Sequence, residues 1–267
     1  MDWDAAYNNE IGLPADTPDY YALWSREAAR FRVAMLAEGR ADLELKYGPD
    51  ARQSIDLFLP RGTPRGLAVF VHGGYWQILD GSSWSHLAAG PLAHNFAVAI
   101  PTYRLCPAVT VTDIAIDVAA AVAQAAAGID GPIHLSGHSA GGHLVARLAT
   151  TTSPLPPTLT GRLGNIVPIS GLHDLRPLKL TSMNRVLRLT DEEVARESPA
   201  LLQPIEGARV TAWVGANERP ELIRQSELLA TNWAHAAIHR AAGRHHFDVI
   251  DGLLDPDDAL TRTLVAD

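Results

Sequence analysis

The sequence has little cysteine, a deficit of positive charge and no long apolar run. Its 267 residues include a single cysteine, Cys106, which cannot form an internal disulfide. Lys and Arg total 22 against 30 Asp and Glu, so the net charge is −8 at pH 7. Phosphate backbones and anionic membranes would be repelled on average, which argues against a nucleic-acid partner. No window reaches the ~20 consecutive apolar residues that a bilayer crossing needs, so we expect no membrane partner.

The single cysteine, the N-terminal residues and the overall composition restrict the class of protein and its expected location. A lone thiol offers neither a zinc-finger set nor a redox pair, so we expect Cys106 to be a small apolar core residue. The chain begins Met1-Asp2-Trp3-Asp4, without the basic and apolar regions of a secretory signal, which predicts a cytoplasmic location. With 47% apolar and 19% charged residues, the chain can bury a large core and is not expected to be disordered. No repeat or long linker divides it, and we predict a single domain over residues 1–267.

What the sequence does contain is an alternation of apolar strands and helical segments. Period-two patterns at residues 43–47 and 54–59 predict antiparallel strands with one face in water. Continuously apolar segments predict strands buried on both faces at residues 66–71, 97–101, 133–136, 166–170 and 210–214. Helical patterns fall between them, near residues 83–93, 112–127, 140–151 and 220–234. This order predicts an α/β fold with a mostly parallel, doubly wound sheet and antiparallel first strands.

Two segments lie outside that alternation. Apolar residues recur near helical spacing at residues 15–39, which predicts a helical N-terminal arm. Residues 171–206 interrupt the strand order after the predicted strand at residues 166–170. Because ligands of open parallel sheets bind beyond the carboxyl ends of the strands, we expect this small cap to roof a site there.

One motif carries a specific chemistry. Gly137-His138-Ser139-Ala140-Gly141 fits G-x-S-x-G, directly after a buried strand and directly before an apolar-periodic helix. A strained turn between strand and helix leaves no room for β-carbons on either side of the serine and lifts its hydroxyl above the sheet. This context predicts a nucleophile elbow with Ser139 as the nucleophile.

A serine hydroxyl needs a base and an acid, which in the α/β-hydrolase fold follow it in the order acid and then histidine. His245 and His246 follow the predicted last strand at residues 238–241, and we favour His246 as the base, with His245 left open. Glu218 follows the strand at residues 210–214, where it could hold the second imidazole nitrogen; Glu221 is the alternative acid.

A third segment predicts the oxyanion hole and part of the substrate site. His72-Gly73-Gly74-Tyr75-Trp76 follows the strand at residues 66–71, where the HGGG-type loop of esterases lies. We expect the backbone N–H groups of Gly73, Gly74 and Ala140 to face the developing oxyanion. The candidate substrate-binding residues are His72, Tyr75, Trp76 and Tyr103. Trp76 could equally be a core residue.

These motifs together resemble the α/β-hydrolase type of kynurenine formamidase (arylformamidase). The likeness runs from about residue 43 to the end and is carried by residues 72–77 (HGGYWQ), 137–144 (GHSAGGHL), 170–175 (SGLHDL), 187–199, 214–226 and 246–248 (HFD). The resemblance implies an α/β-hydrolase fold and hydrolysis of N-formyl-L-kynurenine to L-kynurenine and formate, without a cofactor. It also implies a triad of Ser139, Glu218 and His246, although the family usually has Asp at the position of Glu218.

Other functions fit parts of the same pattern. A carboxylesterase or amidase acting on small aryl esters or other formamides would use the same residues, and a ligand-binding receptor would use the same fold without turnover. A metal enzyme would need ligands such as His134, His138 and His143, but there is no HExxH motif, so we expect these to be structural and expect no metal site. The expected partner is a small aromatic formamide or ester. The oligomeric state stays open, with a homodimer as one option.

Overall fold

An eight-stranded sheet runs through the computed structural model, in the order β1-β2-β4-β3-β5-β6-β7-β8. The structure describes residues 2–267, so Met1 of the predicted 1–267 domain lies outside the described residues. The strands are β1 Ala41–Lys46, β2 Ser54–Phe58, β3 Leu67–Val71, β4 Ala97–Thr102, β5 Ile133–His138, β6 Leu163–Ile169, β7 Arg209–Gly215 and β8 Ala237–Ala241. The β1–β2 and β2–β4 pairs are antiparallel and the other pairs are parallel. The predicted mixed α/β sheet is therefore confirmed.

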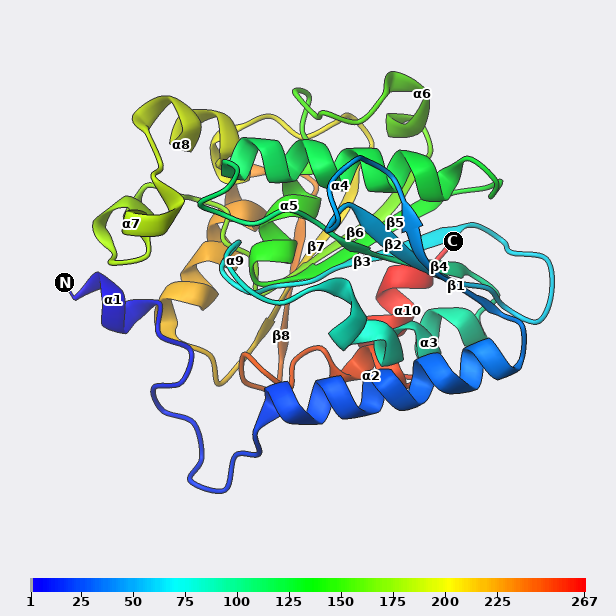
Figure 1. The fold of residues 1–267 in the computed structure, drawn as a ribbon. Helices are drawn as coiled ribbons and strands as arrows, with labels where there is room; N and C mark the ends of the chain where they lie inside the picture. Colours follow the sequence, from blue (N-terminus) through cyan, green and yellow to red (C-terminus); the bar gives the residue numbers. More distant parts are fainter. Residues whose placement is uncertain (1) are drawn as a thin grey trace.

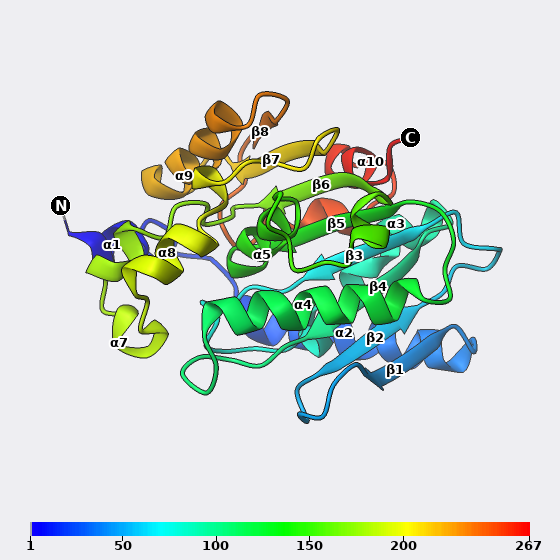
Figure 2. The same ribbon diagram turned by 90° about the horizontal axis from the view of Figure 1, so that it is seen from above.

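Helices cover both faces of the sheet, as Figures 1 and 2 show. The helices are α1 Trp3–Ala6, α2 Tyr20–Ala37, η1 Gly81–Ala88, α3 Ala89–Ala93, α4 Val111–Ala126, α5 Ala140–Leu148, α6 Pro157–Thr160, η2 Pro177–Leu180, α7 Asn184–Leu187, α8 Asp191–Glu197, η3 Pro199–Leu201, α9 Pro220–Asn232, η4 Asp251–Leu254 and α10 Ala259–Val265. Buried side chains of α4, α5 and α9 belong to one core cluster, and those of α2, η1, α3 and α10 belong to a second.

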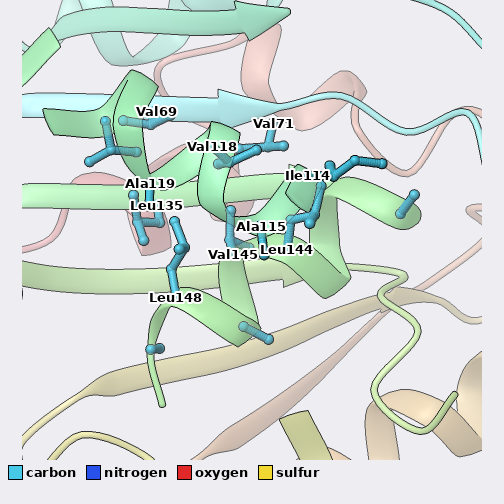
Figure 3. Close-up of a cluster of buried hydrophobic side chains, with 14 of the residues drawn as sticks. Val69, Val71, Ile114, Ala115, Val118, Ala119, Leu135, Leu144, Val145 and Leu148 are labelled. Carbon is cyan, nitrogen blue, oxygen red and sulfur yellow. The ribbon is translucent and has the colours of Figure 1, made fainter. Parts of the chain in front are cut away.

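Alternation along the central strands explains the two clusters. In β3, Val69 and Val71 face the α4 and α5 side, while Phe70 faces the α2 side. Figure 3 shows Val69 and Val71 beside apolar side chains of α4 and α5. A strand with helices on both faces must be apolar at every position, which is why β3 reads as a continuous apolar run.

The N-terminal arm differs from the prediction for residues 15–39. Helix α2 begins only at Tyr20, because Asp19 caps it by accepting the Ala22 N–H and Pro18 disfavours helical backbone at the residue before it. A short helix that the sequence reasoning missed, α1, precedes it. Figures 1 and 2 both place α1 at the same end of the sheet as α7 and α8. The N-terminal segment and the predicted cap at residues 171–206 therefore cover that end together.

Two smaller expectations can be compared directly with the structure. Cys106 is 4% exposed and lies in the core cluster of α4 and α5, as predicted. Among the helices of residues 2–267, none is both long enough and apolar enough to cross a bilayer.

Because several histidines are buried, we expect acid to destabilise the fold. Burial lowers the pKa of His72, His134 and His143 to about 4 and that of His173 to about 3. The folded protein holds these rings in the neutral form, whereas the same rings in the unfolded chain take up protons below the ordinary pKa of 6.5. The folded state therefore keeps its full stability above pH 6.5 and loses stability as the pH falls toward 4. Each pKa unit corresponds to about 1.4 kcal/mol. Burial raises the pKa of Asp251 to about 6 and also raises the pKa of Glu197, and these two carboxyls act in the opposite direction.

We therefore expect the free energy of unfolding to fall by several kcal/mol between pH 7 and pH 4.5. Urea unfolding at pH 7, 5.5 and 4.5 measures it. A His173→Leu variant should show a shallower decline, because it removes one of the rings that must take up a proton. A free energy that stays constant over this range would contradict the expectation.

Candidate active site

Ser139 stands at a strained turn between β5 and α5. Its φ of 55° and ψ of −115° are unusual for a residue with a side chain. A Cβ on Gly141 would lie 1.9 Å from the Val71 carbonyl oxygen, and one on Gly137 would lie 2.4 Å from the Gly141 carbonyl oxygen. Only glycine fits at these two positions. The backbone geometry predicted for G-x-S-x-G is therefore present.

Glu218 and His246 form a buried pair at the carboxyl end of the sheet. His246 Nδ1 lies 2.8 Å from Glu218 Oε2. The other carboxylate oxygen accepts the Ser170 hydroxyl at 2.5 Å and the Gly215 N–H at 2.7 Å. The carboxylate is fully buried, and these donors replace the water it has lost. With a proton on Nδ1, the second imidazole nitrogen, Nε2, is free to accept one.

The imidazole of His246 lies beside the serine elbow. The ring of His138, the residue before Ser139, is centred 4.5 Å from that of His246, and His138 Nε2 lies 2.8 Å from the His246 carbonyl oxygen. Burial and the neighbouring His246 ring lower the pKa of His138 well below its usual range, so His138 is neutral. Ser139 and His246 border the same hollow. In residues 2–267 no hydrogen bond joins them; such contacts often tighten only when substrate binds.

The two alternatives that the sequence left open lie elsewhere. His245 packs edge-on against Tyr20 of α2, with ring centroids 5.5 Å apart. Glu221 accepts the Tyr7 hydroxyl at 2.7 Å and forms an ion pair with Arg224. Neither residue borders the hollow that contains Ser139 and His246. The structure thus pairs Glu218 with His246.

The loop after β3 lies directly against the serine. A Cβ on Gly73 would lie 3.2 Å from the Ser139 Cβ, and Gly74 has a φ of +111° that favours glycine. Tyr75 and Trp76 follow with φ of 56° and 59°, two consecutive left-handed residues that mark stored backbone strain. Within the described chain, the N–H groups of Gly73, Gly74 and Ala140 have no acceptor. All three groups remain available to a ligand.

Two hollows meet at Ser139. The first is lined by Tyr7, Asn9, Tyr75, Trp76, Ser139, Ala140, Leu172, Leu178, Met183 and Leu222. The second is lined by Asn9, Tyr21, Trp24, Gly73, Gly74, Tyr75, Leu79, Trp84, His138, Ser139, His246 and Phe247. Three residues, Asn9, Tyr75 and Ser139, border both hollows. A ligand that spans the hollows must pass between these three side chains.

The four candidate substrate-binding residues divide into two pairs. Tyr75 borders both hollows, and Trp76 lines the first although it is 1% exposed and packs edge-on against His143. His72 and Tyr103 border neither hollow; their rings stack 4.2 Å apart, and the Tyr103 hydroxyl donates to the His72 carbonyl oxygen at 2.8 Å. For His72 and Tyr103 the placement corrects the prediction of substrate contact. His72 follows β3 and Tyr103 follows β4, and both side chains are buried at the ends of these strands.

The sequence reasoning missed the contribution of the N-terminal segment. Tyr7 and Asn9 are both buried and border the hollows. They carry no motif, and they reach the site only because α1 packs against the cap, where the Ser182 N–H donates to Asp4 Oδ1 at 2.6 Å. Cap residues Leu178 and Met183 complete the apolar wall.

The histidines considered as metal ligands each have another contact. His134 Nδ1 accepts the Asn165 N–H at 2.7 Å, and His143 Nε2 lies 2.6 Å from the Glu197 carbonyl oxygen. Over residues 2–267, no group of three or more His, Cys, Asp or Glu side chains is arranged to hold a metal ion.

Comparison with known proteins places this geometry among hydrolases. The profile of the alpha/beta hydrolase family matches residues 68–266. The kynurenine formamidase of Salmo salar is 30% identical over 240 residues, covering 84% of this chain and 80% of the relative. That of Danio rerio is 28% identical, covering 99% and 97%. A crystal structure from Silicibacter sp. TM1040, provisionally described as a thioesterase, is 46% identical over the whole of both chains, with a TM-score of 0.95.

Proposed function

Because the chain belongs to the alpha/beta hydrolase family and, within it, to the kynurenine formamidases, we propose that it cleaves N-formyl-L-kynurenine to L-kynurenine and formate. The observation that carries the proposal is the 2.8 Å contact between His246 and Glu218, beside a hollow shared with Ser139. A serine, an imidazole and a buried carboxylate in this arrangement can perform acyl transfer.

In the first half of the reaction, Ser139 Oγ attacks the formyl carbon and its proton passes to His246 Nε2. Glu218 keeps the other imidazole proton on Nδ1 and stabilises the imidazolium. The carbonyl oxygen becomes negative and accepts hydrogen bonds from the backbone N–H groups of Gly73, Gly74 and Ala140. Each such donor is worth about 3 kcal/mol of barrier lowering.

In the second half, the imidazolium of His246 donates its proton to the leaving nitrogen, the C–N bond breaks and the arylamine departs. A formyl ester on Ser139 remains. Water then loses a proton to His246 and adds to the formyl carbon. The collapsing intermediate returns that proton to Ser139 Oγ, and formic acid leaves and ionises to formate in water. No cofactor takes part in this scheme.

The first hollow suits an uncharged aromatic leaving group. Its lining is mostly aromatic and aliphatic, with one amide, two phenol hydroxyls and the hydroxyl of Ser139, and no charged side chain is among the lining residues. Apolar walls with a few polar groups are typical of sites for small organic ligands. Because the formyl group is small, the second hollow needs no deep acyl pocket. We infer that the charged amino-acid end of N-formylkynurenine lies outside the first hollow.

A second candidate function is the hydrolysis of small aryl esters or thioesters. The 46% identity to the structure described as a thioesterase favours it. The same nucleophile and oxyanion loop would serve, since a phenolate or thiolate leaves more readily than an amine.

A substrate panel distinguishes the two functions. We expect kcat/KM to be higher for N-formyl-L-kynurenine than for p-nitrophenyl acetate or an aryl thioester, with Ser139→Ala as the background control. Turnover of esters or thioesters without any turnover of formamides would overturn the formamidase proposal.

We also propose a cytoplasmic location, which the lone buried Cys106 supports because such thiols persist in reducing compartments. One copy of the chain supplies every residue of the proposed site. The homodimer therefore stays a prediction that the mechanism does not require.

A further inference from the structure

Asn9 is a buried polar residue at the junction of the two hollows. It lies in the segment between α1 and α2 and is 6% exposed. With Tyr75 and Ser139, it borders both hollows. The proposed mechanism assigns Asn9 no task, although Asn9 borders both hollows together with the nucleophile Ser139.

Only one of the two polar atoms in the Asn9 side-chain amide has a hydrogen-bond partner. Its Nδ2 donates to the Tyr75 hydroxyl at 3.1 Å. Its Oδ1 is buried and has no donor among residues 2–267. A buried acceptor without a partner is destabilising, so its presence at a site points to a donor supplied by a ligand.

The segment that carries Asn9 is anchored to the first turns of α9 by the residues that precede Asn9. Two residues earlier, the Tyr7 hydroxyl donates to Glu221 at 2.7 Å and accepts from Gln225 at 2.8 Å. The Ala5 carbonyl oxygen accepts from Arg219 at 3.1 Å. Asn9 is therefore held in place before a ligand arrives, which is the requirement for a group that discriminates between ligands.

We propose that Asn9 Oδ1 accepts a hydrogen bond from the N–H of the scissile formamide and so selects amides over esters. This inference rests on the proposed function. An anilide presents an N–H to the acceptor, whereas an ester presents an oxygen lone pair and a thioester presents sulfur. A site built to bind an N–H discriminates strongly against an analogue that lacks it, because the acceptor is then left unpaired.

The test compares two substrates that differ only in this group, formanilide and phenyl formate, with the spontaneous hydrolysis of the ester subtracted. In Asn9→Leu we expect kcat/KM for formanilide to fall about tenfold to a hundredfold. That for phenyl formate should change by less than about threefold, so the preference for the amide collapses. Equal losses on both substrates, or no loss on formanilide, would overturn the assignment.

Matched variants separate recognition from structure. Asn8 is the exposed neighbour of Asn9, and Asn8→Leu should leave both rates unchanged. Asn9→Asp keeps an acceptor and should keep the amide preference; an aspartate variant that lost it would refute the role of Oδ1. Asn9→Ala replaces the leucine variant if that protein does not fold, with thermal unfolding as the check.

Different results would refute the proposed function and the role of Asn9. A wild-type protein that cleaves neither N-formyl-L-kynurenine nor formanilide refutes the proposed function. A wild-type protein that cleaves formanilide, with an amide-to-ester ratio that Asn9→Leu does not move, refutes only the role of Asn9.

Discussion

Replacing Ser139 with alanine is expected to lower kcat by about 10⁵- to 10⁶-fold and to leave the fold intact. The size of the loss follows from the triad acting as a unit, since without the nucleophile the base has no proton to accept and the acid has no imidazolium to stabilise. The fold should survive because alanine keeps the Cβ and adds no further strain at a φ of 55°.

The measurement is kcat on N-formyl-L-kynurenine, together with labelling by a fluorophosphonate that should mark the wild type and not the variant. The matched control is Ser136→Ala, three residues earlier in β5. The Ser136 hydroxyl donates to the Val69 carbonyl oxygen at 3.0 Å, so its loss should cost about 1 kcal/mol of stability and leave turnover within about threefold. Near-normal turnover in Ser139→Ala would refute the proposed mechanism.

Replacing Glu218 with glutamine is expected to lower kcat by about 10⁴-fold, by analogy with the aspartate of serine-protease triads. Three donors converge on this carboxylate, from Ser170, Gly215 and His246. An amide offers an acceptor on one side only, and its NH₂ group would face a donor. The imidazole would then move its proton to Nε2, where it could no longer accept the proton of Ser139.

Glu221→Gln is the control for this prediction. Glu221 faces Tyr7 and Arg224 and not the imidazole, so we expect the loss in kcat to stay below about tenfold. Circular dichroism and thermal unfolding check that both variants fold. A loss in Glu221→Gln as large as that in Glu218→Gln would move the acid role to Glu221.

Predictions from the sequence agreed with the structure where a short segment determines its own backbone conformation. Gly137 and Gly141 leave no alternative to a tight turn, so the motif alone located Ser139 at the end of a strand. Strand β5 continues two residues beyond the predicted 133–136, because Gly137 and His138 still pair with β6. The extension places the serine directly at the edge of the sheet.

The sequence was less informative about side chains whose position depends on packing against segments distant in the chain. Sequence position alone could not separate His246 from His245, because the two residues are adjacent. In the folded chain His246 contacts Glu218, whereas His245 packs against Tyr20. Glu218 carries one methylene more than the aspartate usual in the family it resembles. The extra length is accommodated by its turn, in which the carboxylate returns to accept the Gly215 N–H.

By itself, the sequence determined the alternation of strands and helices, the antiparallel first strands, the serine elbow and the glycine loop, because hydrophobic period and the steric freedom of glycine are properties of neighbouring residues. Only the tertiary structure decided that His72 and Tyr103 point into the core and that Tyr7 and Asn9 reach the site. Those outcomes depend on how α1 and the cap pack across the end of the sheet, a contact between segments more than 160 residues apart, such as Asp4 and Ser182. The direction of a loop side chain follows from such packing, and no local pattern encodes it.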